Sequence, residues 1–337
     1  MTAKGNRTDA DLVVGVDIGG DKVAIGLVDA DNEVIATAKF STGRERQPGE
    51  VIDELTVEIR DLLYEGGLES TSVGVGICGQ INRADGVVFR SPNLPNWVDV
   101  PLQEKLHDML EMPVTVANDV NVIALGEWTA HSDDDVEDLI VVFVGTGVGG
   151  GIITRGQLFD GHRGFGAEVG HTTIVVDGRE CSCGNRGCLE AYVGGRHIGA
   201  RAREAAEADP DAAAMLIDLA SSVDSIRSEH VGTAYERGNE LATQLIRETG
   251  HYLGAGLVGI VNSFNPKRLV LGGGVIEGIP DLIPLAEEHV REYALTACTR
   301  ELDIVPARMG DRAGIVGGAV LARRALSGER SKSRQQA

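Results

Sequence analysis

The chain has 337 residues, 42% of them hydrophobic, so it is long enough for two domains or one large split domain with a sizeable core. It carries 51 acidic residues against 31 lysines and arginines, a net charge of −20, which excludes the basic surface that nucleic acids and anionic membranes require. No apolar run reaches the roughly 18 residues of a membrane helix, and the first residues lack a signal-peptide pattern. We therefore expect a cytoplasmic protein without nucleic-acid or membrane partners.

The acidic excess also predicts a dependence on salt. Repulsion among the carboxylates destabilises a compact chain at low ionic strength, whereas ~1 M salt shortens the Debye length to about 3 Å and screens it. We interpret the composition as halophilic, the alternative being an ordinary acidic cytosolic enzyme. Thermal unfolding and activity at roughly 50 mM and ~1 M KCl should show the greater stability at the higher concentration. Equal stability and activity at both would contradict this interpretation.

The first half of the chain opens with a hairpin around a glycine turn. A β-branched run from Val13 to Val16 leads into Asp17-Ile18-Gly19-Gly20, and a second apolar run and an Asp-Asn turn follow before a third strand. Apolar spacing then predicts, in order, a helix (51–66), a strand (72–78), a Pro/Asn-rich loop (91–97), a short helix (101–110), a strand (112–119) and a helix (120–128).

The opening pattern returns in the second half, where residues 139–159 are again typical of strand, glycine turn and strand. This return indicates an internal duplication. After a cysteine-rich stretch, the pattern predicts a helical region interrupted by Pro210 (203–220), a long helix (233–264), a strand with a glycine loop (267–278) and a glycine-rich segment running into a helix (310–326). We expect disorder in about ten residues at the start and in 327–337.

Strands that alternate with helices predict an α/β protein. The duplicated hairpins predict two similar lobes with a cleft between them, and such clefts are favoured ligand sites. We expect a small lobe over 1–121 that is completed by a C-terminal helix over 312–326. The larger lobe would span 122–311 and carry a cysteine-rich insertion over 168–190.

Three glycine clusters each follow a short apolar strand and together predict a nucleotide site, because glycine lets backbone N–H groups approach a phosphate closely. The string GTGVGG (145–150) matches the dinucleotide fingerprint, but a strand-like segment follows it instead of a helix. This argues against a nicotinamide dehydrogenase with structural zinc and favours a phosphate cradle built from β-hairpins. The candidate nucleotide-binding residues are Asp17, Gly19, Gly20, Lys22, Gly145, Thr146, Gly147, Gly273 and Gly274.

Three of the five cysteines, Cys181, Cys183 and Cys188, have C-x-C-x4-C spacing, and His171 stands ten residues before them. One histidine and three cysteines suit a tetrahedral zinc ion, which would be structural because protein ligands fill all four positions. A redox pair usually has C-x-x-C spacing, and a disulfide is disfavoured in a cytosolic protein. The remaining alternative is a coincidental grouping of cysteines in a glycine-rich loop.

The motifs together resemble a known family. Strand–DIGG–strand resembles the first phosphate loop of the sugar kinase, heat-shock chaperone and actin superfamily, in which the aspartate, here Asp17, orients Mg²⁺ through water. GAEVGH (166–171) followed by CSCGNRGCLE (181–190) closely resembles the ROK family of sugar kinases and repressors, and the resemblance extends from Asp17 through Gly318. It implies an actin-like, hexokinase-type two-lobed fold of duplicated ribonuclease H-like domains. GTGVGGG would be the second phosphate loop, and LGGGV (271–275) would lie near the adenosine.

The resemblance also implies roles for the site residues. Locally, Asn118 and Asp119 could simply cap a helix. In this family, however, N-D-x-N-x-x-x-x-G-E is the catalytic segment, so Asp119 is implied as the base that takes the proton from the C6 hydroxyl. Zinc would brace a loop that grips the sugar, although Glu190 could instead be a solvated acid at a helix start. The implied sugar-binding residues are Gly79, Asn93, Asn118, Asp119, Glu168, His171 and Glu190.

The activity implied by the resemblance is that of an ATP-dependent glucokinase, which transfers phosphate from Mg-ATP to the C6 hydroxyl of glucose, in a homodimer or homotetramer. Fructose, mannose and N-acetylhexosamine are alternative acceptors. A non-catalytic sugar-sensing repressor is a further alternative, but such repressors carry a helix-turn-helix before the first phosphate loop, and 16 residues precede Asp17 here. Asp21 departs from the Thr or Ser that the family usually has at this position, so the sequence does not specify the phosphoryl donor. It also does not specify the preferred hexose, the oligomeric state or the regulation.

Overall fold

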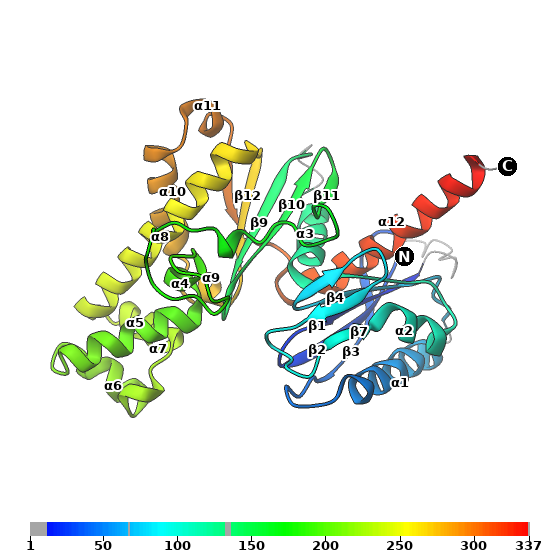
Figure 1. The fold of residues 1–337 in the computed structure, drawn as a ribbon, viewed down its shortest axis with the longest axis horizontal. Helices are drawn as coiled ribbons and strands as arrows, with labels where there is room; N and C mark the ends of the chain where they lie inside the picture. Colours follow the sequence, from blue (N-terminus) through cyan, green and yellow to red (C-terminus); the bar gives the residue numbers. More distant parts are fainter. Residues whose placement is uncertain (1–11, 67, 132–135, 336–337) are drawn as a thin grey trace, which may run out of the picture.

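Residues 12–66, 68–131 and 136–335 are described by a computed structural model, with side chains as far as residue 328. Two five-stranded sheets lie in separate lobes (Figure 1). Within the described residues, no helix is both long and apolar enough to cross a membrane. The eleven N-terminal residues, where we expected disorder, lie outside the described part of the chain.

The first sheet contains the opening hairpin. Its order is β3-β2-β1-β4-β8, with β1, β2 and β3 antiparallel and with β4 and β8 parallel to β1. A small three-stranded sheet, β5-β6-β7, which the sequence did not predict, lies in the same lobe (Figure 1). The strands are β1 (Val13–Ile18), β2 (Lys22–Val28), β3 (Val34–Ser41), β4 (Val73–Ile77), β5 (Gln80–Asn82), β6 (Val87–Arg90), β7 (Val98–Pro101) and β8 (Val114–Asn118).

The second sheet repeats the first. Its order is β11-β10-β9-β12-β13, again with three antiparallel strands and then two strands parallel to the central one. The strands are β9 (Leu139–Val144), β10 (Val148–Thr154), β11 (Gln157–Phe159), β12 (Arg268–Gly272) and β13 (Asp303–Pro306). The predicted duplication and the two-lobed α/β fold are therefore confirmed.

Alternation along β1 decides which helices cover each face of the first sheet. Val14 and Val16 belong to the core beneath α1 (Pro48–Gly66) and α2 (Leu102–Leu110), whereas Val13 packs with residues of α12 (Ala313–Gln335) on the opposite face. A Cβ atom at Gly15 would lie 1.8 Å from the carbonyl oxygen of Ile315, so only glycine allows α12 to lie against this strand.

Helix α12 is longer than expected. The predicted helix ended at residue 326 and disorder was expected after it, but α12 continues to Gln335. The added segment contains no proline and several good helix formers, including glutamate, lysine and arginine, which explains the continuation. The domain limits stay a prediction, and the limit drawn at 121–122 falls within α3 (Asp119–Ala130).

The helices of the second lobe depart from the prediction at several points. No element was predicted between 279 and 309, where the structure has two helices and a strand, and the helical region expected from 203 begins already at Gly195. The long helix expected over 233–264 is two helices, because the chain turns at Gly238 with φ of 75° and the side chain of Asn239 caps the next helix. The helices are α4 (Glu190–Val193), α5 (Gly195–Ala208), α6 (Ala214–Ala220), α7 (Ser228–Glu236), α8 (Glu240–Phe264), α9 (Gly274–Gly278), α10 (Leu282–Tyr293) and α11 (Thr296–Thr299).

Candidate active site

The junction between β8 and α3 places Asn118 and Asp119 at the end of a buried strand. The side-chain oxygen of Asn118 accepts hydrogen bonds from the N–H groups of Val120 (3.0 Å) and Asn121 (3.2 Å), so Asn118 does act as the helix cap. Its amide also donates to the carbonyl oxygen of Gly79 at 3.0 Å. The cap therefore fixes the start of α3 and leaves the Asp119 carboxylate on the first turn of the helix.

Three carboxylates from different parts of the chain share one electrostatic environment. Burial, together with the charges of Asp17 and Glu168, raises the pKa of Asp119 to about 7. Burial also raises the pKa of Asp17 to about 6, against the lowering effect of Lys22. Asp119 is therefore a carboxylate whose pKa suits proton transfer near neutral pH, and Asp17 lies close enough to influence it.

The predicted first phosphate loop is the turn between β1 and β2. The N–H of Gly19 donates to the carbonyl oxygen of Lys22 at 2.9 Å, which closes the turn. A Cβ atom at Gly20 would lie 3.1 Å from the Cβ atom of Asn93, so the predicted sugar-binding asparagine lies beside this loop. The side chain of Asp21 is exposed, and its backbone carbonyl accepts a hydrogen bond from the N–H of Thr42 at 3.0 Å.

The predicted second phosphate loop joins β9 and β10. The carbonyl oxygens of Gly145 and Thr146 accept hydrogen bonds from the N–H groups of Gly195 (2.8 Å) and Arg196 (3.2 Å) at the start of α5. The third loop lies against the end of β9, since a Cβ atom at Gly273 would lie 2.6 Å from the carbonyl oxygen of Val144. The segment after GTGVGG is the strand β10, which removes the basis for the dinucleotide interpretation.

The four predicted zinc ligands lie together. The donor atoms of His171, Cys181, Cys183 and Cys188 all lie within 4.8 Å of one another. Cys183 Sγ lies 3.8 Å from Cys188 Sγ, and Cys181 Sγ lies 3.6 Å from His171 Nδ1. A tetrahedral zinc ion with Zn–S bonds of ~2.3 Å would separate two sulfur ligands by about 3.8 Å. The residues therefore fit a zinc ion in number, type and spacing.

Glu190 connects the cysteine loop, the part of the 168–190 insertion that carries the three clustered cysteines, to the predicted second phosphate loop. Its side chain is buried at 8% exposure, so it is not a solvated acid at a helix start. One carboxylate oxygen accepts the N–H of Val148 (2.9 Å), and the other accepts the hydroxyl of Ser182 (2.7 Å). Ser182 was not predicted from the sequence. Glu190 therefore fixes the two loops relative to each other.

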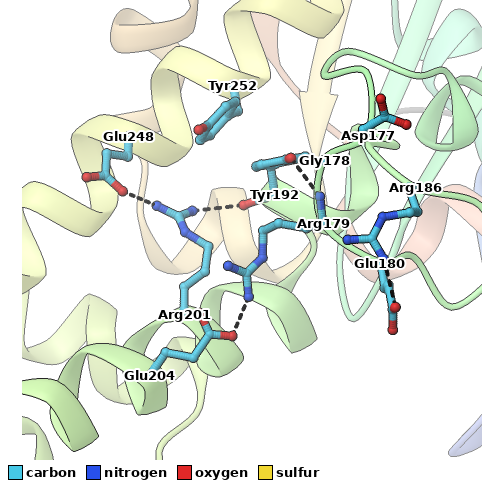
Figure 2. Close-up of a pocket in the computed structure, with 10 residues that line it drawn as sticks. All are labelled: Asp177, Gly178, Arg179, Glu180, Arg186, Tyr192, Arg201, Glu204, Glu248 and Tyr252. Carbon is cyan, nitrogen blue, oxygen red and sulfur yellow. Dashed lines mark hydrogen bonds and ion pairs between the residues drawn. The ribbon is translucent and has the colours of Figure 1, made fainter.

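A cavity of 740 Å³ lies behind the cysteine loop (Figure 2). The three arginines that line it are each paired with a glutamate: Arg179 with Glu204 of α5, Arg186 with Glu180 (2.8 Å), and Arg201 of α5 with Glu248 of α8 (2.7 Å). The hydroxyl of Tyr192 accepts the N–H of Arg179 at 2.9 Å. The Arg179 pair connects the cysteine loop to α5, and the Arg201 pair connects α5 to α8.

Two duplicated sheets, each with a glycine-turn hairpin and joined through α3 and α12, define the class of actin-like, hexokinase-type two-lobed proteins. A structure of this class, a ROK family glucokinase from Streptomyces griseus in complex with glucose and AMPPNP, aligns with a TM-score of 0.80 at 33% identity, covering 93% of this chain and 99% of that one. The ROK family matches residues 13–325. The chain belongs to the ROK family.

Relatives in this family include both enzymes and regulators. A glucokinase of Streptomyces coelicolor is 35% identical over 93% of this chain and 98% of its own length. A xylose repressor of Caldicellulosiruptor bescii is 29% identical over 92% of this chain and 77% of its own length. The family confirms the resemblance identified from the motifs, while the roles of individual residues stay predictions.

Proposed function

We propose that the protein is a sugar kinase that transfers phosphate from Mg-ATP to the C6 hydroxyl of a hexose, with glucose as the preferred acceptor. The observation that carries this proposal is the Asp119 carboxylate, whose pKa is raised to about 7 beside Asp17 of the first phosphate loop. Phosphoryl transfer to an alcohol needs a base beside the attacking hydroxyl and neutralisation of the phosphate charge, and the Asp17 carboxylate would contribute to the second by holding Mg²⁺.

In the proposed reaction Asp119 accepts the proton of the attacking hydroxyl. Asn118 and Gly79 would hold a neighbouring hydroxyl, and Asn93 would extend this pocket toward the first phosphate loop. Mg²⁺ bound with ATP neutralises phosphate charge, and Asp17 would hold it through water. Backbone N–H groups of the two hairpin turns would bind the phosphate oxygens. The residues proposed to contact the nucleotide are Asp17, Gly19, Gly20, Lys22, Gly145, Thr146, Gly147, Gly273 and Gly274.

We also propose that the cysteine loop binds a structural zinc ion through His171, Cys181, Cys183 and Cys188. Glu190 lies 3.6 Å from Cys181 Sγ, and Glu168 acts electrostatically on Asp119, so the ion would hold the side chains that grip the sugar. Burial raises the pKa of Glu168, and the neighbouring His171 lowers it. A carboxylate can accept hydrogen bonds from two hydroxyls, which suits a polyol.

Glucose is proposed because the similar enzymes of Streptomyces are glucokinases and one of them binds glucose in its solved structure. The experiment is nucleotide turnover with Mg-ATP in ~1 M KCl, comparing glucose with fructose, mannose and N-acetylglucosamine. A glucose-dependent rate well above the others supports the proposal. Faster turnover with another hexose would show that this hexose, and not glucose, is the preferred acceptor. Sugar binding without turnover would favour a sensor, as expected of a relative of repressors.

The pH profile of kcat/KM gives a test that depends on Asp119. Because the base must be ionised, activity should rise as pH increases through about 7, the raised pKa of Asp119. A rate already maximal near pH 5 would contradict the assignment.

The free energy of unfolding should change with pH in the opposite direction. The carboxyl groups of Asp17 and Asp119 keep their protons to a higher pH in the folded protein than in the unfolded chain. The stabilisation that comes from this protonation is therefore lost as pH rises from about 4 toward 7.

A further inference from the structure

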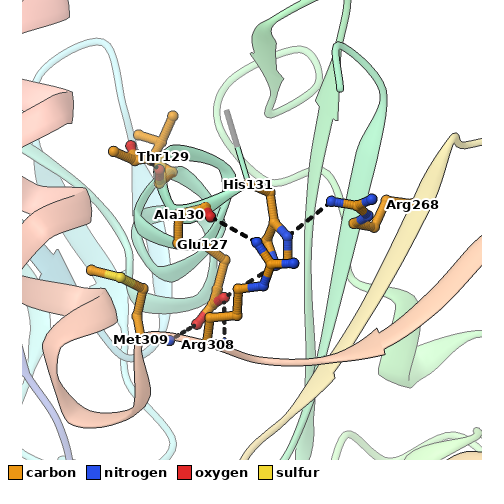
Figure 3. Close-up of polar contacts among 8 residues, drawn as sticks. Glu127, Thr129, Ala130, His131, Arg268, Arg308 and Met309 are labelled. Atoms are coloured by element: carbon orange, nitrogen blue, oxygen red, sulfur yellow. Dashed lines mark hydrogen bonds and ion pairs between the residues drawn. The ribbon is translucent and has the colours of Figure 1, made fainter. Parts of the chain in front are cut away.

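The chain passes from one lobe to the other twice, through α3 into β9 and through residues 307–312 from β13 into α12. Glu127, on α3, binds the second of these passages (Figure 3). Its two carboxylate oxygens accept the N–H groups of Arg308 (2.9 Å) and Met309 (2.8 Å). The side chain is fully buried, at 0% exposure. One carboxylate therefore joins both connections between the lobes.

Close packing supports this contact on either side of Glu127. A Cβ atom at Gly126 would lie 2.2 Å from the carbonyl oxygen of Ala313, so α3 lies directly against the start of α12. The Arg308 guanidinium donates to the carbonyl oxygen of Ala130 at 3.1 Å. The carboxylate also lies just before the short helical turn that leads into α12, where peptide dipoles favour a negative charge.

A second set of contacts connects Glu127 to the sheet of the larger lobe. Arg268, at the start of β12, donates to His131 Nδ1 at 3.0 Å and pairs with Asp303 of β13 at 2.9 Å. Because a guanidinium can only donate, the hydrogen of the buried imidazole lies on Nε2, which faces Glu127 at 3.8 Å. Arg268 therefore holds the His131 ring, and the ring packs against the Glu127 carboxylate at a distance beyond a hydrogen bond.

The segment that Glu127 holds continues directly into the candidate active site. Asp311 pairs with Lys22 of the first phosphate loop at 3.0 Å. A Cβ atom at Gly314 would lie 2.7 Å from the carboxyl carbon of Asp17, so the first turn of α12 packs on this aspartate. Asp119 begins the same helix that carries Glu127, about two turns earlier. A shift of the 307–314 segment against α3 would thus move Asp17 relative to Asp119.

We propose that Glu127 is a positioning residue, which sets the geometry between Asp17 and Asp119 by fixing the second inter-lobe passage to α3. The proposal rests on the proposed kinase activity. It assigns to Glu127 no contact with substrate. Replacing Glu127 should therefore lower kcat, the rate of the catalytic step with substrate bound. Sugar binding, which is proposed to involve Asn118, Gly79 and the cysteine loop, should stay largely unchanged.

Glu127→Gln tests this proposal with little change of shape. The glutamine amide offers one acceptor oxygen, so its NH₂ group would face one of the two N–H donors. We expect kcat to fall by about tenfold to a hundredfold, as misplacement of a reacting group by ~1 Å can do, while the Kd for sugar stays within about threefold. Glu65→Gln, an exposed change on α1 with the same loss of charge, is the matched control and should retain wild-type kcat.

Hydrogen–deuterium exchange of a peptide covering 307–314 provides a measurement that does not depend on turnover. Faster exchange in Glu127→Gln than in Glu65→Gln, together with the split between kcat and Kd, would support the proposal. Faster exchange with kcat within about twofold of wild type would show a merely structural contact and overturn it. Unchanged exchange would also overturn it. A wild-type protein without turnover would refute the kinase proposal, while the exchange result would still test the contact.

If Glu127→Gln does not fold, Glu127→Asp replaces it in the same measurements. Aspartate keeps the charge but shortens the side chain by one methylene, so it can reach the two N–H groups only if the passage moves toward α3. We expect a smaller fall in kcat, again with sugar Kd within about threefold. Loss of sugar affinity in proportion to kcat would contradict a positioning role.

Discussion

Asp119→Asn is expected to lower kcat by about 10²–10⁴-fold while sugar affinity is largely retained. Asparagine has nearly the same size and still accepts a hydrogen bond from the Val120 N–H, so the start of α3 should stay in place. It cannot, however, take a proton from the attacking hydroxyl. Steady-state kinetics and equilibrium sugar binding, measured side by side, give the two quantities.

The control for this substitution is Asp61→Asn, an exposed change of the same kind on α1. It should match the wild type in both kcat and sugar Kd. If Asp119→Asn kept most of the wild-type kcat, the assignment of Asp119 as the base would be wrong. If it lost sugar binding altogether, the result would indicate a binding role, and another group would have to accept the proton.

Cys183→Ser is expected to abolish stoichiometric zinc binding and to weaken sugar binding by about tenfold or more. The Cys183 side chain is exposed, so the change leaves no buried cavity, and its main effect should be the loss of one of four metal ligands. Without the ion, the loop that carries Glu168, His171 and Glu190 loses the link that fixes its two ends. Metal analysis of the purified protein and sugar titration measure these effects.

Cys298→Ser provides the comparison, because Cys298 lies outside the four-ligand cluster. It should keep both the wild-type zinc content and the wild-type sugar Kd. Removal of the metal from wild-type protein with a chelator should reproduce the behaviour of Cys183→Ser. Unchanged zinc content in Cys183→Ser would show that these residues do not bind the ion as proposed.

The sequence predicted the two duplicated sheets because each central hairpin has a recognisable local pattern, an apolar run followed by a glycine turn. The β-branched run before Asp17 and the apolar run before Gly145 gave the two central hairpins, and their repetition gave the duplicated fold. The sheet β5-β6-β7 was missed because its strands have three or four residues, too few for alternation to stand out. The break at Gly238 was missed although it lies in the polar stretch 236–240, where glycine followed by asparagine is typical of a turn and a helix cap.

The candidate site was predictable where ligands are close in sequence and unpredictable where contacts are not. His171 and the three cysteines fall within eighteen residues of one another, and the structure brings them together. The contact of Glu127 with Arg308 joins residues 181 positions apart, and the contact of Gly314 with Asp17 joins residues near opposite ends of the chain. The bond between Glu190 and Val148 likewise depends on how the loops fold, which spacing alone does not reveal.

Helix α12 covers one face of the first sheet, and this has a consequence for synthesis on the ribosome. Val13 and Val28 of the opening hairpin pack against Ile315 and Ala319 of α12. Until those residues emerge, one face of the N-terminal sheet lacks its cover, and an exposed apolar face favours aggregation. The N-terminal lobe therefore finishes folding last although it is translated first, and nascent chains stalled before residue 313 should be the form that chaperones retain.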